Sequence, residues 1–105
     1  MPCSPDPEIA CSLEPGAARS QLGEWATLLR TAVVSSERSD TTTLRMRLDD
    51  TSELGRIAAL SRREVACCPF FRFVIEIESV GAVLTASVPL VAAPILDAFA
   101  ALVTS

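Results

Sequence analysis

Residues 64–78, EVACCPFFRFVIEIE, decide how this chain folds. Pro69 disfavours the α conformation at Cys68, so a helix that arrives from the N-terminal side should stop at the cysteine pair. After the proline, apolar residues alternate with polar or smaller ones in the two-residue period of a strand; the apolar ones are Phe71, Phe73, Ile75 and Ile77. We therefore expect Cys67 and Cys68 to lie at a corner between a helix and a strand.

Towards the C-terminus, this strand is followed by a turn signal and a second apolar alternation. Val80-Gly81 supplies the turn, and Leu84, Ala86 and Val88 form the buried side of the second strand, which together predict a β-hairpin. The remaining residues predict a helix that opens near residues 89–92, with one apolar face that consists of Ile95, Leu96, Phe99, Leu102 and Val103.

Towards the N-terminus, the pattern predicts two helices separated by one strand. Asp50 or Thr51 is expected to cap the helix that ends at the cysteine pair. Residues 44–48 alternate as a half-buried strand after a polar loop over 35–41. The first helix is expected to start after Pro15 and Gly16, to run to about Ser36 and to bury the stripe Ala18, Leu22, Trp25, Leu29, Ala32 and Val33.

These elements give the order α-β-α-β-β-α, which is typical of an α+β fold with a three-stranded antiparallel sheet and helices packed on one face. If the first strand neighbours the second, Arg45 and Arg47 can pair with Glu76 and Glu78 across the outer face. The chain of 105 residues has the size of one domain. We expect a flexible N-terminal tail over residues 1–10, which contains three prolines, and a single thiol-containing domain over 11–105.

Charge and composition exclude several classes of function. The formal net charge is -4 and the nine basic residues are dispersed, so we expect no binding of nucleic acid by the chain itself. No apolar run approaches the roughly 20 residues of a membrane-spanning helix, and the N-terminus lacks the features of a signal peptide. We therefore expect a cytoplasmic protein, in which cysteines are reduced and suited to metal or redox chemistry.

The four cysteines and the absence of histidine direct the search for chemistry to thiols. Cys67 and Cys68 can reach one ion together only where the backbone is irregular, as at a helix end, and Cys11 in a loop before the first helix can complete a three-thiolate site. Such a site suits mercury(II), which we favour, and also arsenite, lead or copper(I). Zinc is the second choice because the spacing is not that of a zinc ribbon. Glu64, one turn earlier, is a candidate oxygen ligand or acid.

The same residues have a simpler structural interpretation. Cysteine is among the most buried residue types, and a single cysteine at the end of an apolar face usually belongs to the core. Two adjacent cysteines before Pro-Phe-Phe, with Cys11 available, favour a functional thiol site, whereas Cys3 alone does not. Trp25 and the phenylalanines at 70, 71 and 73 are expected to fill the core and to form a hydrophobic wall.

Three segments together resemble a small domain of actinobacterial proteins, and the resemblance covers nearly the whole chain. They are ACSL at 10–13, Glu24-Trp25, and EVACCPFFRF at 64–73. That domain occurs alone or behind the DNA-binding part of MerR-like regulators, a family associated with metal sensing. The resemblance implies Cys11, Cys67 and Cys68 as the thiol set. This chain has Gln21 where the pattern has an arginine, and it lacks a helix-turn-helix.

From the residues and the resemblance we expect a metal-binding protein that sequesters, delivers or senses an ion. The resemblance leaves a homodimer or a partner regulator open as the protein partner. An organomercurial-type lyase is the alternative, with two thiols on the metal and Glu64 as the acid that protonates the leaving carbon. A further alternative is a thiol redox protein, although adjacent cysteines form a strained disulfide ring. An interaction domain with buried cysteines also remains open.

Overall fold

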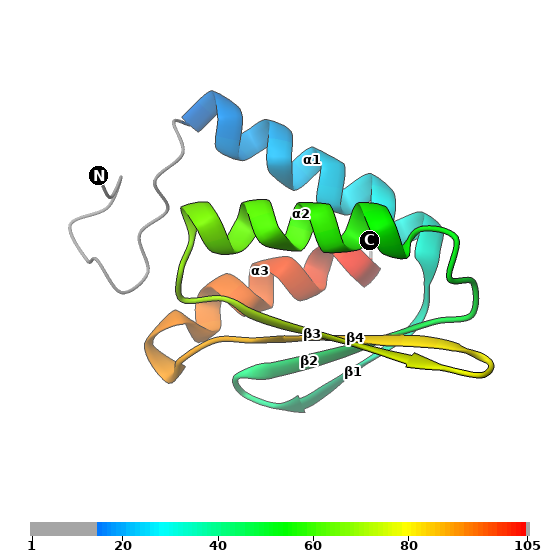
Figure 1. The fold of residues 1–105 in the computed structure, drawn as a ribbon. Helices are drawn as coiled ribbons and strands as arrows, with labels where there is room; N and C mark the ends of the chain where they lie inside the picture. Colours follow the sequence, from blue (N-terminus) through cyan, green and yellow to red (C-terminus); the bar gives the residue numbers. More distant parts are fainter. Residues whose placement is uncertain (1–14, 105) are drawn as a thin grey trace.

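The structure is a computed structural model that describes residues 15–104, with side chains described for residues 21–103. This part of the chain contains three α-helices, one short 3-10 helix and four β-strands (Figure 1). In chain order these are α1 (Pro15–Ala32), β1 (Val33–Asp40), β2 (Thr43–Leu48), α2 (Leu54–Cys67), β3 (Arg72–Glu78), β4 (Gly81–Ser87), η1 (Leu90–Ala92) and α3 (Ala93–Thr104).

The four strands form one antiparallel sheet in the order β1-β2-β4-β3, and all three helices lie on one face of it (Figure 1). The expected α+β class with helices on one face is confirmed. The expected number of three strands and the order α-β-α-β-β-α are wrong, because β1 adds a fourth strand and makes the order α-β-β-α-β-β-α.

Strand β1 occupies residues that were expected to be the end of a helix and a loop. Its sequence VVSSERSD has no apolar alternation, because β1 lies at the edge of the sheet and six of its eight residues are exposed. The register with β2 shifts twice, between Val33 and Ser35 and between Arg38 and Asp40. An edge strand that is polar and bulged gives none of the signals by which a buried strand is found.

Helix α1 therefore ends at Ala32, four residues earlier than expected. Trp25, Leu29 and Ala32 are buried as predicted, but Leu22 is 47% exposed and Gln21 is buried in its place. Gln21 lies one turn before Trp25, on the same face of the helix. The core-facing stripe of α1 thus begins with a polar residue.

Helix α2 ends where the sequence predicts and begins later. It runs to Cys67, and Cys68 has φ -130° and ψ 78°, outside the helical region, as Pro69 requires. The expected cap by Asp50 or Thr51 is wrong: Glu53 precedes the helix and makes no side-chain cap. Asp50 instead accepts a hydrogen bond from the N–H of Ser52 (2.9 Å) and so forms a turn before the helix.

The expected hairpin is present, with β3 ending at Glu78 and β4 starting at Gly81. Gly81 has φ +143°, and a Cβ there would collide with the backbone carbonyl of Leu48, so only glycine fits this approach of β4 to β2. Strand β2 neighbours β4 and not β3, so the condition for direct pairing of Arg45 and Arg47 with Glu76 and Glu78 is not met. Arg47 nevertheless reaches across β4 to Glu78 (2.9 Å).

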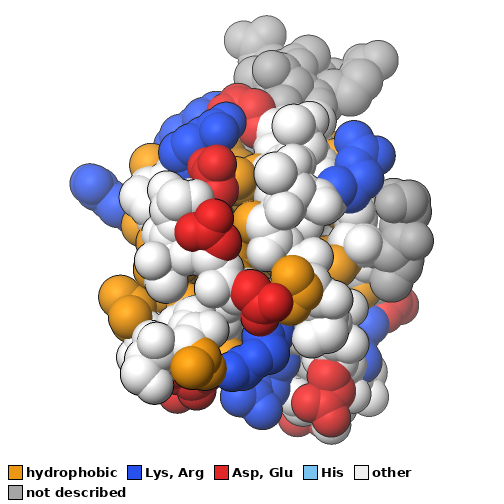
Figure 2. All heavy atoms as spheres, turned by 90° about the vertical axis from the view of Figure 1, so that its right-hand side faces the viewer, with side chains coloured by type: hydrophobic (Ala, Val, Ile, Leu, Met, Phe, Trp, Pro, Cys, Tyr) orange, Lys and Arg blue, Asp and Glu red, His pale blue; other side chains and the backbone are white. Residues whose placement is uncertain are grey.

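One core joins the helices to the inner face of the sheet. Its aromatic part contains Trp25, which stacks on Phe73 (centroids 5.5 Å apart) and meets Phe99 edge-on (5.0 Å). Phe71 stacks on Phe73 at 5.3 Å. At the end of the molecule shown in Figure 2, acidic and basic side chains lie next to one another. None of the helices described for residues 15–104 combines the length and apolar composition that crossing a membrane requires.

Candidate metal centre

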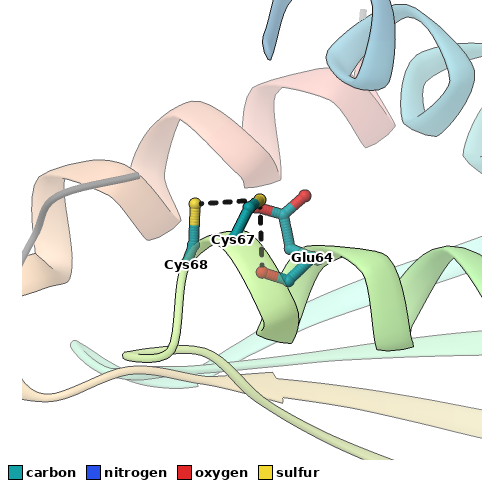
Figure 3. Close-up of side chains that lie close together, drawn as sticks. All are labelled: Glu64, Cys67 and Cys68. Atoms are coloured by element: carbon teal, nitrogen blue, oxygen red, sulfur yellow. Dashed lines mark hydrogen bonds between the residues drawn. The ribbon is translucent and has the colours of Figure 1, made fainter. Parts of the chain in front are cut away.

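The two adjacent cysteines converge because the backbone changes conformation between them. Cys67 is the last residue of α2, and the N–H of Cys68 still donates to the carbonyl of Glu64 (2.7 Å), but the chain then leaves the helix. The Sγ atoms of Cys67 and Cys68 lie 3.5 Å apart (Figure 3). This separation exceeds the about 2.05 Å of a disulfide bond, so the two sulfurs are not joined to each other.

Glu64 brings a carboxylate to the same place, one helical turn before Cys67. The ligand atoms of Glu64, Cys67 and Cys68 all lie within 4.8 Å of one another, so the three residues form a group that could hold a metal ion. Their exposed fractions are 8%, 5% and 4%, respectively. A carboxylate with so little contact with water requires hydrogen-bond donors from the protein.

Two residues of α1 supply those donors. Trp25 Nε1 donates to Glu64 Oε1 at 2.8 Å, and Gln21 Nε2 donates to the same oxygen at 2.9 Å. The indole N–H can only donate, so Oε1 is the acceptor in this hydrogen bond. Gln21 Nε2 also lies 3.5 Å from Cys67 Sγ and thus links the carboxylate to the thiol.

The exposed side of the same helix pair carries a separate ion pair. Arg63 Nη1 and Nη2 donate to the two carboxylate oxygens of Glu24, each at 2.9 Å. The hydrogen bond from Arg63 lowers the pKa of Glu24 below its ordinary value. The pKa of Arg63 is raised, mainly by Glu24 and to a smaller extent by the charges of Cys67 and Glu64.

The structure thus brings together three of the residues singled out in the sequence, Cys67, Cys68 and Glu64. Cys11, the expected third thiol, and Cys3 lie outside the described residues. Trp25 is fully buried, as expected, but it also contacts the site through its N–H. Sequence reasoning assigned Gln21 no role in the site. The available signal was its position four residues before Trp25, on the face that packs on α2.

Comparisons of this chain with protein-family models, curated proteins and solved structures found no match. The resemblance to the actinobacterial domain therefore stays a prediction. The case for a function depends on the geometry of the site itself.

Proposed function

We propose that this protein binds one soft metal or metalloid ion through the thiolates of Cys67, Cys68 and Cys11, for sequestration, delivery or sensing. The observation that carries the proposal is the convergence of Cys67 Sγ, Cys68 Sγ and the Glu64 carboxylate within 4.8 Å. Mercury(II) is the preferred ion, arsenite, lead and copper(I) belong to the same class, and zinc is the second choice.

The sulfur separation is close to that of two ligands on one ion. For metal–sulfur bonds of about 2.3 Å at a tetrahedral angle, two sulfurs lie about 3.8 Å apart. The observed 3.5 Å needs only a small rotamer adjustment to match this value. Chelation by two adjacent residues is otherwise difficult on a regular helix, and here the helix end at Cys68 makes it possible.

Chain geometry allows Cys11 to join the pair. Helices α1 and α2 run in opposite directions, so the start of α1 lies above the end of α2 (Figure 1). Gln21, whose amide contacts Cys67 Sγ, is about 9 Å along the helix from Pro15. The four residues from Cys11 to Pro15 can span up to about 14 Å, which is enough to return to the site.

The surroundings favour thiolate–metal bonds over exchange with water. Phe71 is 5% exposed and belongs to the same core cluster as Cys67 and Cys68. A dry, apolar surrounding strengthens electrostatic attraction between an ion and its ligands. The chain has no histidine, so a soft ion meets sulfur and carboxylate ligands only.

The test is titration of the reduced full chain with mercury(II), arsenite, zinc and copper(I), followed by native mass spectrometry and by thiolate–metal absorption. We expect one tightly held soft ion per chain. Cys67→Ser, Cys68→Ser and Cys11→Ser should each weaken binding by at least about a hundredfold, because each removes one soft ligand.

Cys3→Ser is the matched control, since it removes a thiol from the same chain without touching the proposed set. Equal loss of affinity in Cys3→Ser would refute the three-thiol assignment. If the protein binds these metal ions no more tightly than a peptide with free thiols does, Cys67 and Cys68 have only a structural role.

The carboxylate beside the two sulfurs also supports a second candidate, an organomercurial-type lyase. In that reaction the thiols hold the metal and Glu64 protonates the leaving carbon, which breaks the carbon–metal bond. Because Oε1 accepts from Trp25 and Gln21, Oε2 is the oxygen that would deliver the proton in this reaction. Release of hydrocarbon from an organomercurial, lost in Glu64→Gln, would favour the lyase, and binding without release favours the binding protein.

A further inference from the structure

We infer that two copies of this chain pair through strand β3, antiparallel and edge to edge, to form one continuous sheet. This inference concerns a different part of the molecule from the metal site and does not depend on the proposed function. It starts from a contrast between the two edges of the sheet, β1 and β3.

Strand β1 has the features that protect an edge from pairing. It is polar, its register shifts twice, and Arg38 ties it to α3 through an ion pair with Asp97 (2.7 Å). Strand β3 differs in two respects: it pairs with β4 without a register shift over all seven residues, and its inner-face residues Phe73, Ile75 and Ile77 are apolar. Its ion pair, between Glu78 and Arg47, lies within the sheet and does not join the strand to a helix. A regular edge strand with an apolar inner face is a template for another strand.

Apolar side chains along β3 are exposed to an unusual degree. Ile77 is 72% exposed and points to the inner face, opposite Ala82 of β4, while Val74 on the outer face is 42% exposed. A groove of about 410 Å³ runs beside this edge, between α2 and β3, and is lined by Ser61, Arg62, Val65, Ala66 and Phe73. A partner strand placed on the edge would bring its own inner-face residues to this groove.

The sequence of β3 is complementary to itself in one antiparallel register. With a two-fold axis at Ile75, Arg72 lies opposite Glu78 of the second copy, Phe73 opposite Ile77, and Val74 opposite Glu76. The exposed Ile77 of each copy then enters the groove beside Phe73 of the other. Each Arg72 meets a carboxylate, which in this structure already binds Arg47.

The neighbouring registers are less favourable. Residues opposite each other must lie on the same face, so the axis can move only by whole residues. An axis at Glu76 places two carboxylates directly opposite each other, and an axis at Val74 leaves Ile77 and Glu78 outside the paired region. The register centred on Ile75 pairs the whole strand. It makes an isologous interface, in which every contact occurs twice.

The test is the oligomeric state of the reduced full chain, measured by sedimentation and native mass spectrometry over a range of concentrations. The reductant excludes dimers held by disulfides. We expect a reversible dimer that Ile77→Lys weakens by at least about tenfold, since a charge in each of two symmetric positions has to enter an apolar groove. Val34→Lys, on the other edge and 56% exposed, is the matched control and should leave the dimer unchanged.

A charge exchange tests the register. Arg72→Glu and Glu78→Arg should each weaken the homodimer, because like charges then face each other twice. A mixture of the two variants should form a heterodimer, in which every glutamate faces an arginine. A chain that stays monomeric at all concentrations, a dimer weakened by Val34→Lys but not by Ile77→Lys, or a mixture without heterodimer would overturn the inference. Circular dichroism of each variant separates loss of pairing from loss of fold.

Discussion

Two carboxylates, Glu24 on α1 and Glu64 on α2, each accept hydrogen bonds from the other of these two helices, and their surroundings are opposite. Glu24 and Trp25 are neighbours on α1, and Arg63 and Glu64 are neighbours on α2. On the exposed side Glu24 pairs with Arg63, while on the buried side Glu64 accepts hydrogen bonds from Trp25 and Gln21. A step of one residue along each helix thus leads from an exposed ion pair to a buried carboxylate next to two thiols.

Only one of these two acids can contribute to the core and to the candidate metal site. An exposed ion pair is screened by water and contributes little to folding. A buried carboxylate is stable only with hydrogen-bond donors in place, and without it the buried N–H of Trp25 would lose its acceptor. Removal of Glu64 should therefore lower both the stability of the fold and the affinity for a metal ion.

The largest effect is expected from Glu64→Ala. This change leaves the buried N–H of Trp25 without its acceptor and Gln21 with only the weaker acceptor Cys67 Sγ, and we expect a loss of about 2–4 kcal/mol in the free energy of unfolding. Urea denaturation followed by circular dichroism measures it. Glu24→Ala is the matched control and should change the midpoint little. Similar losses in both variants would remove the distinction between the two acids.

A second effect concerns metal affinity. Glu64→Gln keeps an oxygen that can accept from Trp25 but removes the negative charge beside the two sulfurs. We expect the affinity for the bound ion to fall by about tenfold or more, as is usual when a charged neighbour of a metal site is lost. Competitive titration against a chelator of known affinity measures it, with Glu24→Gln as the control. An unchanged affinity would exclude Glu64 from the site.

A smaller effect is expected from Trp25→Phe. The phenyl ring preserves much of the stacking with Phe73 and Phe99, while the N–H donor to Glu64 is lost. We expect a loss of stability of about 1.5–2 kcal/mol, at the lower end of the range for a hydrogen bond to a charged group, because Gln21 still donates to Glu64. Thermal unfolding measures it. No change at all would mean that the indole N–H is not needed by Glu64.

Much of the α2–β3 corner could be predicted from sequence, because local rules determine it. Pro69 acts on Cys68 directly, and the alternation after it is that of a strand with one buried face. The site residues Cys67, Cys68 and Glu64 follow from the same segment, since all three lie within five residues. The structure places the ligand atoms of these three residues together, and their binding of a metal stays a prediction.

The remaining features depend on contacts between distant segments, which no local pattern encodes. Strand β1 is polar on both faces from Ser35 to Asp40, so only its pairing with β2 defines it there. The turn between them does have a local signal, because Asp40 accepts a hydrogen bond from the N–H of Thr42 (2.8 Å). Gln21 is polar in a core stripe, and its burial makes sense only once Glu64 lies opposite it.

The smallest effect is expected from Glu24→Gln and concerns the dependence of stability on pH. The hydrogen bond from Arg63 lowers the pKa of Glu24 below its ordinary value of 4.5. A carboxyl whose pKa is lower in the folded state stabilises the fold above its unfolded pKa, and this contribution is lost as the pH falls through the folded pKa. The difference in melting temperature between wild type and Glu24→Gln should therefore be small but positive at pH 7 and should vanish in acid, below the folded pKa. Glu64 is present in both proteins, so its contribution to this difference cancels.

An NMR titration of the Glu24 carboxyl, repeated in Arg63→Gln, should show the pKa of Glu24 return towards 4.5. A pKa that stays low without Arg63 would mean that another group lowers it.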